Sequence, residues 1–197
     1  MFYEFAGAGR LYDFVINKAI PADWRRRCAA LAGGRVLEVG VGTGLMLPYY
    51  DSAVTEVVGI DHSPAMLEQA GIPARGCSFP VRLETMDVEE LQCESASFDT
   101  VVAAFVFCSV KNPRRGLAEC RRVLRPGGRL VLMEHVRSRK GWLALALTAL
   151  NPVTVFLLGD HVTRDTVALA REVGFRIESV EALWNDVVIL TKGTVAE

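Results

Sequence analysis

Short apolar runs bounded by turn residues recur along the chain, a pattern typical of buried strands. The pattern predicts strands at 35–40, 56–60, 98–107 and 129–135, and the alternating segment 81–86 predicts one more. A helix is predicted before the first of them, at 23–31, and further helices between them, at 63–71 and 113–124. Ser63 caps the second helix and Gly71 closes it. Strands that are apolar on both faces and alternate with helices favour a mainly parallel sheet covered by helices on both sides.

The last part of the chain is spaced differently. A helix is predicted at 165–173, ended by Gly174, and is followed by strands at 175–183 and 186–192. The turn between these strands, at Trp184 and Asn185, is too short for a helical crossover, so one of the two is antiparallel. We therefore expect a single α/β domain of seven strands with an antiparallel last strand.

Composition narrows the classes of function. The chain has 197 residues, 51% hydrophobic and 23% charged, enough for the core and surface of one domain. Its net charge of -1 lacks the basic excess typical of nucleic-acid binding. The five cysteines form no CxxC pair and have no histidine at zinc spacing, so we expect no metal site. Their odd number and the lack of a signal-peptide pattern favour a cytoplasmic location.

One apolar run stands apart from this pattern. From residue 142 to 158 the only polar side chains are Thr148, Asn151 and Thr154, and the basic segment 137–140 precedes the run. A membrane-spanning helix needs ~20 apolar residues, and Pro152 divides this run into two shorter pieces. The sequence argues against a membrane span and leaves a buried or interfacial role open.

The main chemical signal is the segment VLEVGVGTG at 36–44. A buried strand leads into a turn with glycines at 40, 42 and 44, where the missing side chains let the backbone approach a ligand. Asp61 ends the next strand, where an acid can accept hydrogen bonds from ribose hydroxyls. The spacing matches neither the dinucleotide fingerprint G-x-G-x-x-G nor the phosphate loop that ends in Gly-Lys-Ser/Thr. It predicts a nucleoside-binding site of another kind.

The glycine loop, Asp61, Asp87, the strand FDTVVA and the turn LRPGGRL follow one another in this order. With these motifs the chain resembles class I S-adenosyl-L-methionine-dependent methyltransferases (methyltransferase type 11, the ubiquinone–menaquinone methyltransferase-like superfamily) over nearly its whole length. The resemblance implies a Rossmann-like, seven-stranded, mostly parallel sheet. It also implies S-adenosylmethionine as the cofactor, released as S-adenosylhomocysteine.

The same resemblance assigns roles to residues of the glycine loop and the strand ends. The acid that matches Glu38 helps to position the methionine end, Asp61 binds the ribose, and Asp87 accepts from the adenine amino group. The expected cofactor-binding residues are Glu38, Gly40, Gly42, Gly44, Asp61, His62, Met66, Asp87, Val88 and Phe105.

The residues expected to bind the methyl acceptor show a weaker resemblance, to one subgroup of this family. The motif EH…GDHVTRDT and the start VLEVGVGTGLMLPYY resemble bacterial phospholipid N-methyltransferases and lipid-associated methyltransferase-like proteins. In the wider family, residues matching 1–32 fold over the cofactor as a helical cap, and the insertion at 136–164 shapes the acceptor site. Candidate catalytic residues there are His135, His161 and Tyr12, with Glu134 beside the first.

The apolar run and the basic residues before it lie within the insertion that is expected to shape the acceptor site. Its basic residues Arg137, Arg139 and Lys140 attract anionic headgroups, with about 1 kcal/mol available for each near a membrane surface. We expect peripheral contact with the inner membrane surface through 137–158, while the oligomeric state stays open.

Three hypotheses follow from the sequence. The first is methyl transfer to a hydrophobic or lipid-like acceptor, such as the amine of phosphatidylethanolamine. The second is methylation of a small molecule, either a quinone precursor or a thiol. The third is a regulatory module that binds the cofactor without turnover, with the apolar run as a protein interface.

Overall fold

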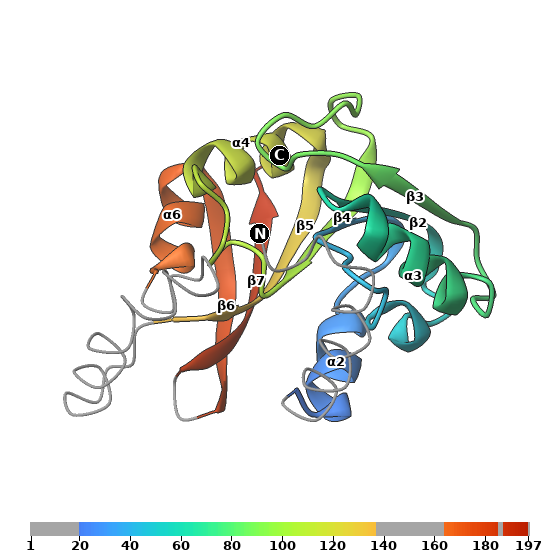
Figure 1. Cartoon of the computed structure of the whole chain (residues 1–197). Helices are drawn as coiled ribbons and strands as arrows, with labels where there is room; N and C mark the ends of the chain where they lie inside the picture. Colours follow the sequence, from blue (N-terminus) through green and yellow to red (C-terminus); the bar gives the residue numbers. More distant parts are fainter. Residues whose placement is uncertain (1–19, 137–163, 185–186, 197) are drawn as a thin grey trace.

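The computed structural model describes residues 20–136, 164–184 and 187–196, and within them the strands form one sheet (Figure 1). Its order is β3-β2-β1-β4-β5-β7-β6. The strand β7 runs antiparallel to both β5 and β6, while the other neighbours pair in parallel. The strands are β1 (Gly34–Val39), β2 (Val54–Asp61), β3 (Val81–Thr85), β4 (Phe98–Ala104), β5 (Leu124–His135), β6 (Phe175–Trp184) and β7 (Val188–Val195). The predicted seven-stranded, mostly parallel sheet with an antiparallel last strand is confirmed.

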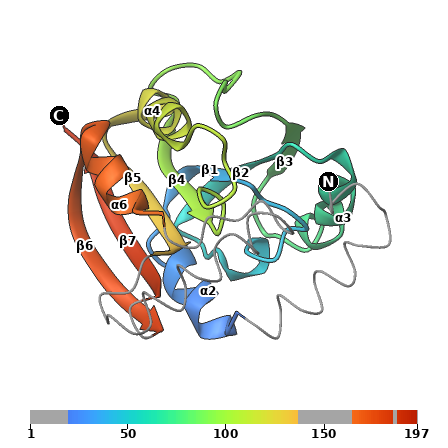
Figure 2. The ribbon, with the colours of Figure 1, turned by 60° about the vertical axis from the view of Figure 1, so that its left-hand side comes forward.

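Helices cover both faces of this sheet, as predicted (Figures 1 and 2). One face carries α4 (Pro113–Val123) and α6 (Thr166–Glu172), which bury Leu117 and Ala170. The other carries α2 (Ala22–Ala29), the 3₁₀ turn η2 (Leu47–Tyr49) and α3 (Pro64–Ala74), which bury Cys28, Leu47 and Leu67.

Adjacent residues of the central strands pack into the two hydrophobic cores on opposite faces of the sheet. Val36 and Val102 pack on the α2 side, whereas Leu37 and Val101 pack on the α4 side. Successive side chains of a strand point to opposite faces, so a strand covered on both sides needs apolar residues at nearly every position. This explains the continuous apolar runs in the sequence.

Several element boundaries differ from the prediction. The helix α3 continues past Gly71 to Ala74, where Pro73 in its last turn packs under the glycine loop. The strand β4 ends at Ala104 because Phe105 adopts a φ of 58°, which no extended strand can contain. The strand β5 starts early, at Leu124, and residues 125–128 form a bulge in it.

The two segments expected to cover the site lie mostly outside the described residues. Of the cap at 1–32 the structure describes 20–32, and of the insertion at 136–164 only its first and last residues. The cap and insertion boundaries therefore stay predictions. No helix in the described ranges is long and apolar enough to cross a membrane.

Candidate active site

The predicted site residues come from five neighbouring strands and lie at one edge of the sheet. Glu38, Asp61, Asp87, Phe105 and His135 are each at, or just beyond, the carboxyl end of β1, β2, β3, β4 and β5. From the β1–β4 pair, the chain adds β2 and β3 on one side and β5 on the other. Ligands of open α/β sheets bind at such a switch point, so the position fits a cofactor site.

Asp61 closes the glycine loop onto the second strand. Its Oδ2 accepts a hydrogen bond from the Gly42 backbone N–H at 3.0 Å, and its Oδ1 accepts one from the Ser63 N–H at 2.9 Å. The carboxylate is buried, yet a carboxylate has about four acceptor positions, so two remain for ribose hydroxyls. The bonds with the backbone fix the direction in which the remaining positions point.

The three glycine positions of the loop exclude a larger side chain for different structural reasons, or not at all. A Cβ on Gly40 would lie 2.5 Å from Val106 Cγ2, and one on Gly44 would lie 2.8 Å from Pro73 Cγ. These two glycines are required by the protein's own packing. A Cβ on Gly42 would meet nothing nearer than a backbone oxygen at 4.0 Å. The open space next to Gly42, whose φ is 55°, therefore marks the part of the loop that a ligand can approach.

Glu38 is a buried acid with a carboxylate oxygen that lacks a hydrogen-bond partner in the described part of the chain. Its side chain is 3% exposed, and its Oε2 has no hydrogen-bond partner among the described residues. Burial raises the pKa of its carboxyl to about 8, and the neighbouring Tyr50 hydroxyl partly lowers it. A buried acceptor without a partner is costly, and a cationic donor such as an amino acid ammonium would satisfy it. Glu38 thus fits the methionine end of the expected cofactor.

The acceptor side of the edge is organised by a residue whose role the sequence did not reveal. Glu134 Oε1 accepts hydrogen bonds from the Val106 and Phe107 N–H groups at 2.9 and 3.0 Å. Its side chain is 1% exposed, so it holds the turn after β4 instead of contacting solvent. The turn places the Phe105 ring 4.7 Å from the His135 ring, which brings these two predicted residues together. An acid at the end of an apolar strand was the only signal in the sequence.

A second anchor of the same turn comes from the segment just before α6. Arg164, just before that helix, donates to the Val110 carbonyl at 2.7 Å and also to the carbonyl of Phe107. The turn that carries Phe105 is therefore fixed from two sides, by β5 and by the last residue of the insertion. Phe105 itself has a positive φ, rare for a bulky residue and typical of functional sites.

The remaining predicted site residues differ in their exposure to solvent, and two of them lie outside the described residues. His62 is 77% exposed, with its Nδ1 3.4 Å from Asp61 Oδ1, whereas Met66 and Val88 are buried. Tyr12 and His161 lie outside the described residues. The described parts of the chain contain no group of three or more potential metal ligands.

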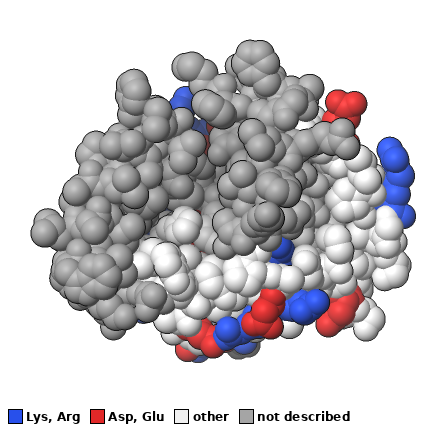
Figure 3. Space-filling model, turned by 60° about the horizontal axis from the view of Figure 1, so that its bottom comes forward, with Lys and Arg blue, Asp and Glu red and all other residues white. Residues whose placement is uncertain are grey.

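The surface gives two further observations. On the face in Figure 3, basic and acidic side chains of the described residues lie next to one another. A cavity of about 310 Å³ lies near the first residues of β1, β3 and β4, lined among others by Arg35, Arg82 and Phe98. None of the predicted site residues that the structure describes lines this cavity, and the candidate site stays at the carboxyl edge, where the glycine loop and the buried acids converge.

Comparisons with known proteins agree with this geometry. A family model described as a methyltransferase domain matches residues 37–132, which run from β1 to β5. The S-adenosylmethionine-dependent methyltransferase of Mesorhizobium loti has the same fold, with a TM-score of 0.66 at 20% identity over 88% of this chain and 98% of that one. Fold and site thus define a methyltransferase of the Rossmann-like type.

Two curated relatives are more similar in sequence. The phosphatidylethanolamine N-methyltransferase of Cereibacter sphaeroides is 43% identical over 144 residues, covering 71% of this chain and 70% of that protein. The demethylmenaquinone methyltransferase of Deinococcus radiodurans is 39% identical over 140 residues, covering 68% of this chain and 58% of that protein. The chain belongs to the class I S-adenosylmethionine-dependent methyltransferases. The resemblance inferred from its motifs is confirmed, and with it the prediction of an enzyme.

Proposed function

We propose that this enzyme methylates a hydrophobic or lipid-like acceptor, with the amine of phosphatidylethanolamine as the first candidate. The observation that carries the proposal is the 43% identity to a phosphatidylethanolamine N-methyltransferase, over a region that includes most of the chain. The apolar run with its basic neighbours, which lies outside the described residues, supports the same class of acceptor from the sequence.

The cofactor side of the site divides among the residues described above. Glu38 would hold the methionine ammonium, Asp61 the ribose hydroxyls, and Asp87 with the Val88 backbone the adenine. Gly42 leaves the space in which the backbone meets the ligand. S-adenosylmethionine supplies an activated methyl group, so the protein's main task is to align the acceptor with it.

The acceptor side requires removal of a proton. An amine attacks only when it is neutral, so a base near the acceptor nitrogen helps. His135 ends β5 at the correct edge of the sheet, and its ring packs on Phe105. We assign His135 the role of receiving the amine proton at an imidazole nitrogen, with Phe105 holding the ring in place. His161 and Tyr12 stay predictions for the same site.

The membrane contact through 137–158 belongs to the same proposal. A lipid acceptor is presented at a surface, so the protein would be located in the cytoplasm and attach peripherally to the inner membrane. The basic residues of this segment predict binding that depends on anionic lipid and weakens with salt.

A second candidate acceptor is a quinone precursor. The similarity to a demethylmenaquinone methyltransferase favours it, although the chain spans only 58% of that protein. A quinone precursor in its reduced, hydroquinone form can attack the methyl group through a ring carbon, which then loses its proton, and its ring is largely apolar, so both candidates fit an apolar acceptor site. The acceptor atom distinguishes them.

The experiment uses the full chain and S-adenosylmethionine labelled in its methyl group. Vesicles containing phosphatidylethanolamine, vesicles containing a demethylated menaquinone kept in its reduced form, and a soluble thiol are offered separately, and the labelled product is identified. We expect label in the phospholipid headgroup, and Asp61→Ala should abolish it. Label only in the quinone or the thiol would replace the first candidate, and full turnover by Asp61→Ala would refute the cofactor site.

A further inference from the structure

We propose that Arg122 and Glu119 of α4 are positioning residues for Asp87, the acid assigned to the adenine amino group. They act by fixing the backbone of the connection from β3 to β4, here called the adenine loop (residues 86–97). This inference rests on the proposed cofactor site and adds to it a support that lies on a different element.

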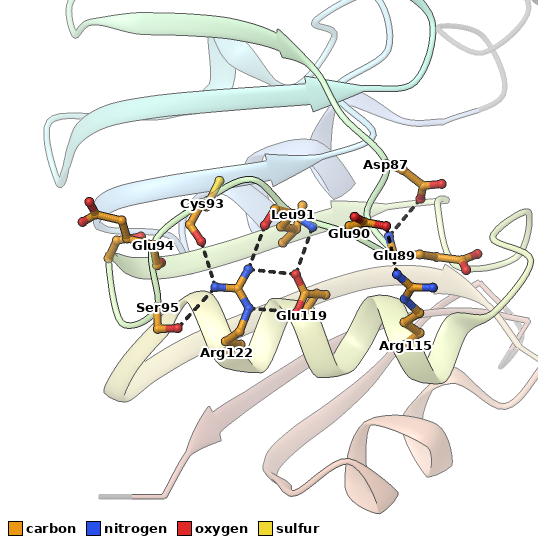
Figure 4. Close-up of polar contacts among 11 residues, drawn as sticks. Asp87, Glu89, Glu90, Leu91, Cys93, Glu94, Ser95, Arg115, Glu119 and Arg122 are labelled. Carbon is orange, nitrogen blue, oxygen red and sulfur yellow. Dashed lines mark hydrogen bonds and ion pairs between the residues drawn. The ribbon is translucent and has the colours of Figure 1, made fainter.

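The adenine loop needs such a support because of its own structure. It contains no helix and no strand, so its backbone N–H and C=O groups have no regular ladder to join. Backbone groups that fold against a protein core must find partners, and here side chains of α4 supply them (Figure 4).

Arg122 spans the centre of the loop. Its guanidinium donates to the carbonyls of Leu91 and Cys93, each at 2.8 Å, and to the Ser95 hydroxyl at 3.2 Å (Figure 4). The same group makes two bonds to the Glu119 carboxylate, each 2.8 Å long. The rigid, planar fork of an arginine fixes several acceptors at once, so one side chain sets the path of five loop residues.

Glu119 supplies a hydrogen-bond acceptor where Arg122 supplies donors, and we call these two side chains the clamp. Its Oε2 accepts from the Leu91 N–H at 2.9 Å, so both backbone groups of Leu91 are held by the pair. The bonds from Arg122 are the main reason that the pKa of the Glu119 carboxyl lies below its usual range. The pair therefore stays ionised at neutral pH and keeps its geometry.

A chain of contacts leads from α4 to Asp87 itself. Arg115 pairs with Glu90 at 3.0 Å, and Glu89 accepts from the Asn112 N–H at 2.7 Å. The Glu89 N–H in turn donates to Asp87 Oδ1 at 2.8 Å (Figure 4). Asp87 thus has one oxygen fixed by its own loop, which leaves the other oxygen to accept from a ligand.

Packing brings the same two elements together on their apolar side. Val88 is buried in the core under α4, and a Cβ on Gly116 would lie 3.3 Å from Val88 Cγ1 and 3.1 Å from Phe107 Cε1. The helix therefore lies in close contact with the loop at this glycine. The polar clamp and the close packing position Asp87 and Val88 as one unit.

The test compares Arg122→Met and Glu119→Gln with Arg114→Met in the full-length enzyme. Arg114 is the matched control, because it lies on the same helix but pairs with Glu172 of α6, at 2.5 Å. We expect the Kd for S-adenosylhomocysteine and the KM for S-adenosylmethionine to rise roughly tenfold in Arg122→Met, as for the loss of bonds to a charged group. The loss should fall on these quantities and not on kcat, and Arg114→Met should match the wild type.

A double-mutant cycle with Asp87→Asn shows whether Arg122 acts through the acid. If it does, the double variant binds S-adenosylhomocysteine hardly more weakly than Asp87→Asn alone. Fully additive losses, or equal losses in Arg114→Met, would overturn the inference. Should Arg122→Met fail to fold, Glu119→Gln, which keeps shape and size, carries the same cycle.

The inference and the proposed function can fail separately. Binding of S-adenosylhomocysteine is measured without any acceptor, so a wrong acceptor does not affect it. Weak binding by Asp61→Ala together with normal binding by Arg122→Met would retain the cofactor site and reject the clamp. Normal binding by Asp61→Ala would reject the cofactor site itself.

Discussion

The buried carboxyl of Glu38 should make the protein less stable as the pH rises, and the variant Glu38→Gln should remove this dependence. Burial raises the pKa of Glu38 from 4.5 to about 8 in the folded protein. Below pH 4.5 both the folded and the unfolded chain carry a neutral carboxyl, so the group costs nothing. Between pH 4.5 and about 8 only the unfolded chain ionises, and stability is lost throughout this window.

The magnitude follows from the width of that window. Each pH unit costs about 1.36 kcal/mol, and pH 7 lies 2.5 units above 4.5, so the loss at pH 7 is about 3 kcal/mol. Replacement by glutamine changes the packing and hydrogen bonding equally at every pH. The informative quantity is therefore the change with pH in the stability difference between Glu38→Gln and wild type.

Urea unfolding at pH 5, 6, 7 and 8 measures this quantity. We expect Glu38→Gln to gain between about 2 and 3 kcal/mol on the wild type from pH 5 to pH 7. The exposed acid Glu68 on α3 offers the matched control, and Glu68→Gln should run parallel to wild type. A stability difference for Glu38→Gln that stays constant across the pH range would refute the reasoning.

The same group predicts how the cofactor binds. An ammonium next to Glu38 favours the ionised carboxyl, so binding at pH 7 should release close to one proton from a group with a pKa of about 8. Calorimetry of S-adenosylhomocysteine binding in buffers of different ionisation enthalpy counts that proton. Glu38→Gln should bind more weakly and release none, so a variant that gains stability loses function.

Three further predictions concern single contacts. Asp61→Asn loses one of the two acceptors that hold the Gly42 and Ser63 N–H groups, so S-adenosylhomocysteine binding measured by calorimetry should weaken at least about tenfold; unchanged affinity would contradict the role of Asp61. Glu134→Met removes the acceptor of both N–H groups in the turn after β4 at nearly the same side-chain size, so we expect unfolding in urea to become easier by about 2 kcal/mol or more, with kcat reduced and cofactor affinity retained; a loss of cofactor affinity alone would speak against this. Gly116→Ala forces a methyl group within 3.1 Å of Phe107, so thermal unfolding should show a cost of about 1 to 3 kcal/mol; a fully stable variant would show that α4 can move away from the adenine loop.

The sequence placed most elements correctly because their signals are local. Apolar runs predicted most of the early strands, alternation predicted the one at 81–86, and the short turn between the last two strands predicted the antiparallel one. The boundaries failed where a distant contact decides them. The helix α3 runs through Gly71 because its last turn packs under Gly44, and β4 is followed by a turn in which Glu134 accepts from the Val106 and Phe107 N–H groups.

By itself, the sequence determined the class of fold, the glycine loop and the acids at the strand ends, because periodicity and motif spacing are written in neighbouring residues. Only the tertiary structure decided how these residues contact one another and their surroundings. It showed that Gly40 and Gly44 serve internal packing while Gly42 borders open space. It also showed that Arg122, 31 residues from Leu91, holds the loop of Asp87. Such roles depend on contacts between distant parts of the chain, which no local pattern records.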